Sequence, residues 1–244
     1  MIEVKNVFKN FSNNFSLENI SCVFYPGKIN MIIGESGSGK TTLLKSMIGL
    51  HSIDKGEILF EKSNYFDLDN SEKNILRREI GMLFQQGALF DFMTVLENVK
   101  FPLKMLANKT DQEIYERASF CLERVNLFKA KNMMPSELSG GMIKRVAIAR
   151  AIAMNPRYLF CDEPNSGLDP NTAIIIDDLI KEITEEYNIT TIINTHDMRS
   201  VVRIGSNIIY LSNGLLEWSG KKQEIKYSDS DSLNKFFNNS KIKI

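Results

Sequence analysis

The loop from Gly34 to Thr41 carries residues whose types and spacing suit the binding of phosphate. The pattern G-x-x-x-x-G-K-T is formed by Gly34, Glu35, Ser36, Gly37, Ser38, Gly39, Lys40 and Thr41. Glycines let the backbone turn tightly and aim its N–H groups inward, and the N-terminus of a following helix adds a positive dipole end. Lys40 would reach the β- and γ-phosphates, and the Thr41 hydroxyl would ligate Mg²⁺. The sequence therefore predicts binding of a nucleoside triphosphate.

The segments on both sides of this loop have the patterns that its chemistry needs. The apolar run 29–33 predicts a short buried strand, and the residues from Thr42 to Ile48 have the spacing of a helix. A phosphate-binding loop of this kind joins a strand to the N-terminus of a helix. The context supports the loop prediction and adds Thr42 to the candidate nucleotide-binding residues.

The composition argues against several classes of protein. The 244 residues are 43% hydrophobic and 25% charged, and 30 basic side chains balance 30 acidic ones, so the formal net charge is zero. That balance disfavours a general polyanion binder, although it does not exclude a local basic patch. We find no secretory signal at the N-terminus and no apolar stretch long enough to span a bilayer. The scattered residues Cys22, Cys121 and Cys161 predict reduced core cysteines of a cytosolic protein.

Strand patterns and helix patterns alternate along the chain, as is typical of an α/β fold. Strands are predicted at residues 2–7, 17–24, 56–60, 80–84, 158–161 and 189–194. The first two would be antiparallel, and each of the last two follows a helix. That alternation implies a parallel sheet with right-handed crossovers.

Two further regions have distinct patterns. Residues 87–137 are mainly helical, and one helix face, for which we expect Asp111 as the cap, is formed by Ile114, Ala118, Leu122 and Val125. Near the end of the chain, Asn213-Gly214 between two apolar runs predicts a hairpin. A short terminal helix that packs on the rest of the chain is predicted within residues 229–243 by the spacing of Leu233, Phe236 and Phe237.

Further motifs follow the phosphate loop in a fixed order. They are Gln85, Leu138-Ser139-Gly140-Gly141-Met142, Phe160-Cys161-Asp162-Glu163-Pro164, Ser166-Gly167-Leu168-Asp169 and Asn194-Thr195-His196-Asp197. In this order they resemble the Q-loop, the signature motif, the Walker B strand with its glutamate, the D-loop and the switch-histidine region of ABC ATPases. The resemblance extends over nearly the whole chain.

The chemistry of these residue types agrees with the resemblance. Asp162, at a strand end, can hold the hydration shell of Mg²⁺ opposite Thr41. Glu163 can act as base or positioning group for the water that attacks the γ-phosphoryl group. Gln85 can offer an oxygen to Mg²⁺ and an amide to that water, and His196 can hydrogen-bond the γ-phosphate. Glu163, His196 and Gln85 are thus candidate catalytic residues, and Thr41, Gln85 and Asp162 are candidate metal ligands.

The signature residues imply that one chain is insufficient for hydrolysis. Ser139, Gly140 and Gly141 open a predicted helix, whose N-terminus is an anion site. In the family this site reaches the γ-phosphate that a second subunit holds. The resemblance therefore implies a homodimer with two nucleotides between the copies, and Asp169 of the D-loop would act across that interface.

Some assignments have alternatives. Phe11 matches the family's ring that stacks on adenine, although it could simply pack in the first sheet. Gln86 is an alternative to Gln85 as the Q-loop residue, but the Phe-Gln order favours Gln85. We expect His51 to be a capping or surface residue. Asn165 replaces a usual threonine and Asn194 a usual aliphatic residue, and we expect neither to touch a catalytic position.

The resemblance also implies the fold and its division. We expect an α/β P-loop NTPase of the ABC ATPase type, with a mixed sheet core, an N-terminal antiparallel β-subdomain and an inserted α-helical subdomain. Residues 1–244 would form one domain. Its nucleotide-binding core would be 1–86 and 138–220, its helical subdomain 87–137, and its C-terminal extension 221–244.

Two segments indicate a narrower group. Residues 81–91 contain Gly-Ala-Leu-Phe-Asp after the Q-loop, and residues 138–147 carry Met142 where most relatives have glutamine. Both resemble the ATPase of Mla/Mce-type phospholipid transporters. That resemblance implies a peripheral, ATP- and Mg²⁺-dependent homodimer at the cytoplasmic face of a bacterial inner membrane. Its partners would be integral membrane permease subunits and an Mce-domain lipid-binding protein, with no nucleic acid.

Other functions remain open from the sequence. The chain could serve another ABC transporter, such as an amino-acid importer or a lipoprotein-releasing system. A third hypothesis is a role outside transport. If that role were a pure scaffold, the intact Glu163 would argue against it.

Overall fold

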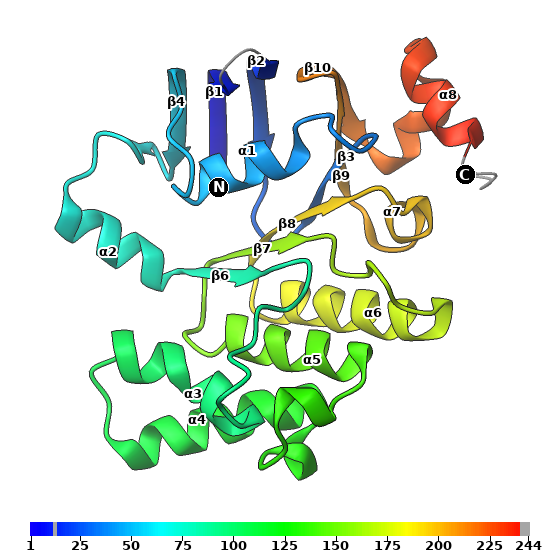
Figure 1. The fold of residues 1–244 in the computed structure, drawn as a ribbon. Coiled ribbons are helices and arrows are strands. Elements are labelled where there is room, and N and C mark those ends of the chain that lie inside the picture. The colour runs from blue at the N-terminus through cyan, green and yellow to red at the C-terminus, as the bar shows by residue number, and fades with distance from the viewer. Residues whose placement is uncertain (12–13, 240–244) are drawn as a thin grey trace.

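The computed structural model describes residues 1–11 and 14–239, which form two sheets and the helices around them (Figure 1). The smaller sheet is antiparallel and has the strand order β2-β1-β4-β5. Its strands are β1 (Ile2–Phe11), β2 (Asn14–Phe24), β4 (Lys55–Phe60) and β5 (Ser63–Asn64). The first two strands thus extend further towards their connection than the predicted ranges 2–7 and 17–24.

The larger sheet has the order β10-β9-β3-β8-β7-β6 and is mixed. It is parallel from β9 to β6, and only β10 runs antiparallel to its neighbour. Its strands are β3 (Ile29–Ile33), β6 (Ile80–Leu83), β7 (Tyr158–Asp162), β8 (Thr190–Thr195), β9 (Asn207–Ser212) and β10 (Leu215–Lys221). The parallel arrangement brings the carboxyl ends of β3, β6, β7 and β8 to one edge of the sheet.

Both faces of this sheet are buried. On β3, Met31 and Ile33 belong to the core on the side of α5 and α6, whereas Ile32 belongs to the core shared with α1 and the smaller sheet. Leu159 and Phe160 of β7 divide between the two cores in the same way. Successive side chains of a strand point to opposite faces, so a strand buried on both sides is a continuous apolar run. This explains the uninterrupted apolar segments in the sequence.

The helices form layers on these sheets (Figure 1). α1 (Lys40–Met47) lies between the two sheets, and α5 (Gly140–Ala151) and α6 (Pro170–Glu186) lie on the other side of the larger one. α3 (Val95–Leu106) and α4 (Asp111–Arg124) pack on each other and on α5. The remaining helices are α2 (Asn70–Arg78), α7 (Met198–Ile204), α8 (Asp231–Asn239) and the 3₁₀ turns η1 (Phe128–Ala130), η2 (Pro135–Glu137) and η3 (Lys222–Tyr227). Among the described residues, no helix has both the length and the apolar character that a membrane crossing requires.

The predicted α/β architecture with an antiparallel N-terminal sheet is confirmed. The Asn213-Gly214 hairpin is confirmed as well, since both residues have positive φ and join β9 to β10. The predicted terminal helix is α8, which buries Leu233 and Phe237 against the core. Residues 240–243 of the predicted range lie outside the described part of the chain. The division into core, subdomain and extension stays a prediction.

The cysteine prediction holds for two positions. All three cysteines are free, Cys121 and Cys161 are buried, and Cys22 is only half-buried on β2. Burial raises the pKa of the Cys121 thiol to about 11, so it is protonated at neutral pH.

The prediction that Asp111 caps α4 is wrong by one residue. Thr110 is the cap: its hydroxyl accepts from the Glu113 N–H at 3.3 Å, and the Glu113 carboxylate accepts from the Thr110 N–H at 2.7 Å. This reciprocal pair satisfies two N–H groups at once, which a cap at Asp111 would not. The helix face that this cap orients is buried as predicted, at Ile114, Ala118, Leu122 and Val125.

We predict that Thr110→Ala lowers the free energy of unfolding by about 1 kcal/mol, the usual cost of losing an N-cap. Asp111→Ala, which removes only a carboxylate from the first turn, should cost less than about 0.5 kcal/mol. Urea unfolding followed by circular dichroism measures both. A larger loss from Asp111→Ala than from Thr110→Ala would restore the original cap prediction.

Candidate nucleotide-binding and hydrolysis site

The predicted chemistry-bearing segments meet at the carboxyl edge of the parallel strands. A cavity of about 700 Å³ opens there. It is lined by Glu35, Ser36, Gly37, Ser38, Gly39, Lys40, Thr41, Thr42, Gln85, Glu163, His196, Met198 and Phe236. The segment after β3, the segment after β6, the end of β7 and the segment after β8 therefore share one cavity, as ligand sites in open α/β sheets do.

The loop after β3 has the backbone that phosphate binding requires. Gly34 has φ +150°, and a β-carbon there would lie 2.2 Å from the Leu211 carbonyl oxygen, so only glycine fits. Gly39 precedes α1 with φ +103°, and the helix N-terminus therefore opens on the loop. The arrangement presents backbone N–H groups and a positive helix end to the cavity.

Lys40 is held by the loop itself. Its Nζ donates to the carbonyl oxygens of Gly34 at 2.9 Å and Glu35 at 2.8 Å. Burial lowers the pKa of Lys40, and the nearby carboxylates of Glu163 and Asp162 oppose that shift. The ammonium group is thus fixed at the cavity wall, where it can neutralise phosphate oxygens.

Asp162 is the centre of an oxygen-rich cluster at the end of β7. Its Oδ1 accepts from the Thr41 hydroxyl at 3.1 Å and from the Asn194 amide at 3.2 Å. The Asn194 Oδ1 is buried and has no partner among the described residues. Hydroxyl, carboxylate and amide oxygens are the donor set that suits a small hard cation such as Mg²⁺. The expectation that Asn194 touches no candidate catalytic position is wrong, because the Asn194 carbonyl oxygen accepts from the Glu163 N–H at 3.0 Å. The register of β8 on β7 places Asn194 opposite Asp162 as well.

Glu163 and His196 meet at the cavity. Glu163 Oε1 lies 2.8 Å from His196 Nδ1. The Glu163 side chain is 13% exposed and that of His196 is 64% exposed. Glu163 has φ +49°, a left-handed conformation that is uncommon for glutamate, and such strain gathers at functional sites. With this conformation at the end of β7, the Asp162 side chain is buried and the Glu163 side chain lines the cavity.

Gln85 shares this cavity and contacts the same turn. Its Nε2 donates to the Ser166 hydroxyl at 3.3 Å. Its backbone oxygen accepts from the buried Lys144 ammonium, which also donates to the Glu163 backbone oxygen at 3.4 Å. Burial lowers the pKa of Lys144, and the neighbouring acidic groups oppose the shift. Lys144 of α5 therefore connects two of the predicted catalytic residues through their backbones.

Sequence reasoning missed Lys144, Met198 and Phe236. Phe236 of α8 lies 5.4 Å, ring to ring, from Tyr210 of β9, which brings the terminal helix to the cavity wall. The sequence predicted the helix but not where it packs, since that contact joins distant segments. Lys144 had no sequence feature that separated it from other helix lysines.

Three predicted elements lie outside this cavity. Phe11 is 42% exposed, with its ring 5.2 Å from that of His51 in an edge contact, and its role as an adenine platform stays a prediction. Ser139 caps α5 by accepting from the Met142 N–H at 3.3 Å. Asp169 caps α6.

The signature segment instead lies beside the D-loop. A β-carbon at Gly141 would lie 2.5 Å from the Thr172 methyl group, and one at Gly140 would lie 3.6 Å from Leu168. None of Ser139, Gly140 and Gly141 lines the phosphate cavity of the same chain.

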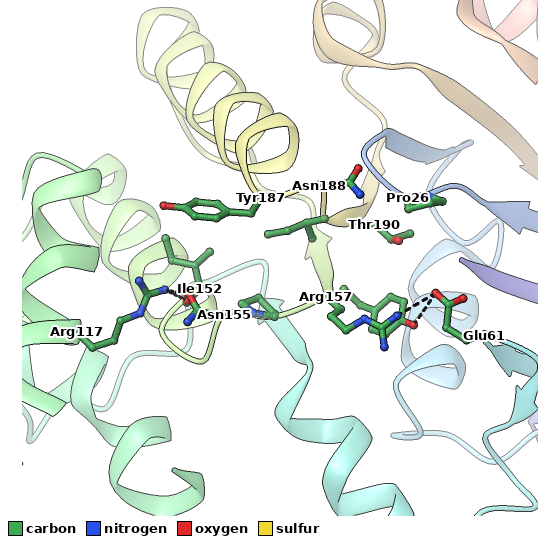
Figure 2. Close-up of a pocket in the computed structure, with 12 residues that line it drawn as sticks. Pro26, Glu61, Arg117, Ile152, Asn155, Arg157, Tyr187, Asn188 and Thr190 are labelled. Carbon is green, nitrogen blue, oxygen red and sulfur yellow. Dashed lines mark hydrogen bonds and ion pairs between the residues drawn. The ribbon is translucent and has the colours of Figure 1, made fainter. Parts of the chain in front are cut away.

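A second pocket lies at the opposite ends of the strands and has a different character (Figure 2). Arg117 donates to the carbonyl oxygens of Ile152 and Ala153, and Arg157 pairs with Glu61 and Glu79. Both guanidinium groups are therefore already engaged with acceptors from the described part of the chain. The cavity at the carboxyl edge is the candidate nucleotide site.

Comparisons with known proteins show the family of this chain. The family model described as "ABC transporter" matches residues 17–166. The methionine import ATP-binding protein MetN of Clostridioides difficile is 37% identical over 99% of this chain and 75% of its own. The phosphonates import ATP-binding protein PhnC of Fusobacterium nucleatum is 36% identical over 94% of this chain and 96% of its own. The intermembrane phospholipid transport system ATP-binding protein MlaF of Haemophilus influenzae is 38% identical over 93% of this chain and 86% of its own.

Solved structures give the same result. The dimeric structure of MJ0796, a bacterial ABC transporter cassette, superposes with a TM-score of 0.83 at 37% identity and covers 91% of this chain and 99% of its own. A post-hydrolysis state of the same cassette, bound to ADP and phosphate, has a TM-score of 0.83 at 36% identity, with the same coverage. The protein is therefore an ABC-type ATPase cassette. The chain belongs to the ABC transporter family, and it is an ATP-binding and ATP-hydrolysing subunit.

We predict that Glu163→Gln lowers ATP turnover by ~10²–10⁴-fold, the range for loss of a general base. The amide keeps the shape and the contact with His196 but cannot accept a proton from water. Phosphate release by the purified variant measures the change, with the exposed Glu182→Gln of α6 as control. Turnover within about twofold of wild type would remove Glu163 from this role.

We predict that Lys40→Ala weakens ATP binding by at least about a hundredfold, since a charge-assisted contact to phosphate is lost from a buried side chain. Titration calorimetry with ATP measures the dissociation constant. Lys45→Ala on the same helix is the matched control. Affinity equal to wild type in Lys40→Ala would contradict the assignment of the loop.

Proposed function

We propose that this chain drives a bacterial transporter that moves phospholipid between the inner and outer membranes. The observation that carries the proposal is the pair of segments 81–91 and 138–147, which resemble Mla/Mce-type ATPases in a chain that is 38% identical to MlaF. In this proposal the chain acts as a homodimer at the cytoplasmic face of the inner membrane. It pairs there with integral permease subunits and an Mce-domain lipid-binding protein.

The geometry of the two segments supports treating them as one feature. Arg150 of α5 donates to the carbonyl oxygens of Gly87 and Ala88, each at 2.7 Å. Gly87 has φ +77° and packs so closely on α5 that a β-carbon would lie 2.8 Å from Ile143. The Gly-Ala turn and the signature helix are thus packed against each other, so a change in one would disturb the contacts of the other.

The residues that follow this turn form an aromatic surface. Phe90 contacts the rings of Phe92 and Phe101 at 5.7 and 4.7 Å, and its backbone is held by hydrogen bonds to the buried Asn98. Phe92 is 76% exposed. An exposed aromatic side chain on a fixed backbone suits contact with a permease.

Mg²⁺ and ATP are the expected cofactors. Thr41, Asp162 and Gln85 would hold the ion, which would supply charge neutralisation at the phosphates. In the described part of the chain, no group of three or more His, Cys, Asp and Glu forms a metal cluster. A nucleotide-bound Mg²⁺ needs only one or two carboxylates, and Asp162 supplies one. Glu163 would accept a proton from the attacking water, with His196 holding the carboxylate.

A shared catalytic site is part of the proposal. The N-terminus of α5 is not in the chain's own phosphate cavity, so the anion site at Ser139 is available to a second copy. The dimeric solved relative supports this arrangement. No nucleic acid is expected among the partners.

An importer of amino acids is the second candidate. The methionine import relative matches 99% of this chain at 37% identity, close to the value for MlaF. Identity alone does not separate the two functions, so the choice rests on the two segments.

Purification of the tagged chain from membranes of the cells that naturally produce it tests the proposal. We expect permease subunits, an Mce-domain protein and bound glycerophospholipid by mass spectrometry. Recovery of an importer permease with an amino-acid-binding protein would favour the second candidate and contradict the first. The same preparation of cells without the tag is the control.

We predict that Ser139→Arg abolishes hydrolysis and leaves ATP binding by a single chain within about threefold of wild type, because Ser139 lies outside the chain's own cavity. Ser71→Arg on the exposed face of α2 is the control. Turnover assays and ATP titration measure the two effects separately. Equal loss of binding and hydrolysis would contradict the shared site.

A further inference from the structure

A buried hydrogen-bonded cluster joins three elements behind the catalytic edge. The Asn165 Nδ2 donates to Asp177 Oδ1 at 2.7 Å and to Ser200 Oγ at 2.9 Å. Asp177 and Ser200 are each 3% exposed. Asn165 lies in the turn after β7, Asp177 in α6 and Ser200 in α7. The cluster therefore connects segments that lie far apart in the sequence.

Two of these elements adjoin a candidate catalytic residue. Asn165 follows Glu163 by two residues, within a turn closed by a hydrogen bond from the Ser166 N–H to the Glu163 carbonyl at 3.1 Å. α7 begins directly after the His196 segment, with Asp197 as its cap. A shift of the turn or a rotation of α7 would break the cluster and move Glu163 relative to His196.

Stability does not explain the cluster by itself. Among the described residues, Asp177 forms no ion pair, because the nearby Arg203 is engaged with Asp178 at 2.6 Å. Burial raises the pKa of Asp177, Asn165 and Ser200 oppose that shift through hydrogen bonds, Asp197 adds to it, and Arg203 opposes it. A buried carboxyl without a cation is costly, and apolar residues in place of all three side chains would pack there at lower cost.

The Asn165 amide is oriented so that its NH₂ group joins Asp177 to Ser200. Its two donations go to Asp177 and Ser200, while its Oδ1 is buried and has no partner among the described residues. The side chain is therefore held by its donors alone. An aspartate at this position could not donate to the Asp177 carboxylate.

The contact between Glu163 and His196 is too weak to fix its own geometry. His196 is 64% exposed, and an exposed carboxylate–imidazole pair contributes little free energy. Buried hydrogen bonds are stronger constraints on geometry, because breaking one leaves a buried polar group without a partner.

We propose that Asn165, Asp177 and Ser200 form a positioning cluster that holds Glu163 against His196 during ATP hydrolysis. Asp177 is the acceptor on which the other two side chains converge. The proposal rests on the roles proposed above for Glu163 and His196, and it adds residues that touch neither nucleotide nor metal.

Asp177→Ala tests the cluster through steady-state kinetics of the purified chain. We expect kcat to fall by about tenfold or more, within the roughly hundredfold loss that a displacement of about 1 Å can cause. KM for ATP and the dissociation constant of ATP should stay within about twofold, because the phosphate loop does not contact the cluster. A merely structural residue would lower the melting temperature without this separation of kcat from KM.

Thr184→Val is the matched control. Thr184 also lies in α6 and is buried, and it hydrogen-bonds Thr191 of β8 at 2.6 Å, away from the nucleotide cavity. Its loss should reduce stability and leave kcat unchanged below the melting temperature. An equal fall of kcat in Thr184→Val and Asp177→Ala would overturn the positioning role.

Two further variants show whether the cluster acts through the proposed residues. In a His196→Ala background, Asp177→Ala should change kcat by less than about twofold, since the contact to be positioned is already absent. The exchange Asn165→Asp with Asp177→Asn restores a donor facing an acceptor and should recover most of the lost kcat. A full additional loss in the first case, or no recovery in the second, would contradict the proposal.

The outcomes separate this proposal from the proposed function. Wild-type turnover in Glu163→Gln would overturn the roles of the catalytic residues and that of the cluster with them. Reduced turnover in Glu163→Gln, together with unchanged kcat in Asp177→Ala, would overturn the cluster alone. Should Asp177→Ala fail to fold, Ser200→Ala decides: a fall in kcat of about threefold supports the proposal, and an unchanged kcat overturns it.

Discussion

The parallel pairing of β3, β7 and β8 is the constraint on which the site depends. It sets Asp162 beside Asn194 and Ile33 beside Thr195, so the chain leaves all three strands at the same height. A one-residue slip would turn Asp162 towards the other face and bring Glu163 or Cys161 in its place. The buried apolar side chains on both faces oppose that slip, because it would exchange the two cores. Catalytic geometry is thus secured by packing well away from the nucleotide.

Charge at this edge is arranged before any nucleotide arrives. Lys40 and the N-terminus of α1 supply positive potential at the loop, and Asp162 and Glu163 supply negative potential opposite them. Lys144 lies behind both carboxylates and is bound to backbone oxygens, so it moderates their repulsion without occupying the cavity. Phosphoryl transfer depends mainly on such fixed positioning and charge neutralisation. The polar groups of this edge are of that kind, and the reaction needs no covalent nucleophile.

The sequence determines the local parts of this arrangement better than the contacts between them. The phosphate loop, the buried strands and the Asn213-Gly214 hairpin could be predicted because neighbouring residues alone define them. The cap of α4 was missed by one position, since Thr110 and Asp111 are both good caps and only the reciprocal bond with Glu113 selects one. Lys144 and Phe236 could not be assigned, because their proximity to the cavity arises from packing between segments distant in sequence. The catalytic assignments came from motif order, which states roles but not distances.

Asn194 and Asn165 both form hydrogen bonds close to Glu163. The sequence marks them only as departures from a family pattern. Asn194 donates to Asp162 through its side chain, and its backbone oxygen accepts from the Glu163 N–H at 3.0 Å. Asn165 fixes the turn on the other side of Glu163 through Asp177. An aliphatic residue at position 194 would leave Asp162 with the Thr41 hydroxyl as its one side-chain donor among the described residues. The two asparagines therefore act on one strained residue from opposite sides, and amide side chains suit this because each can donate where a carboxylate must accept.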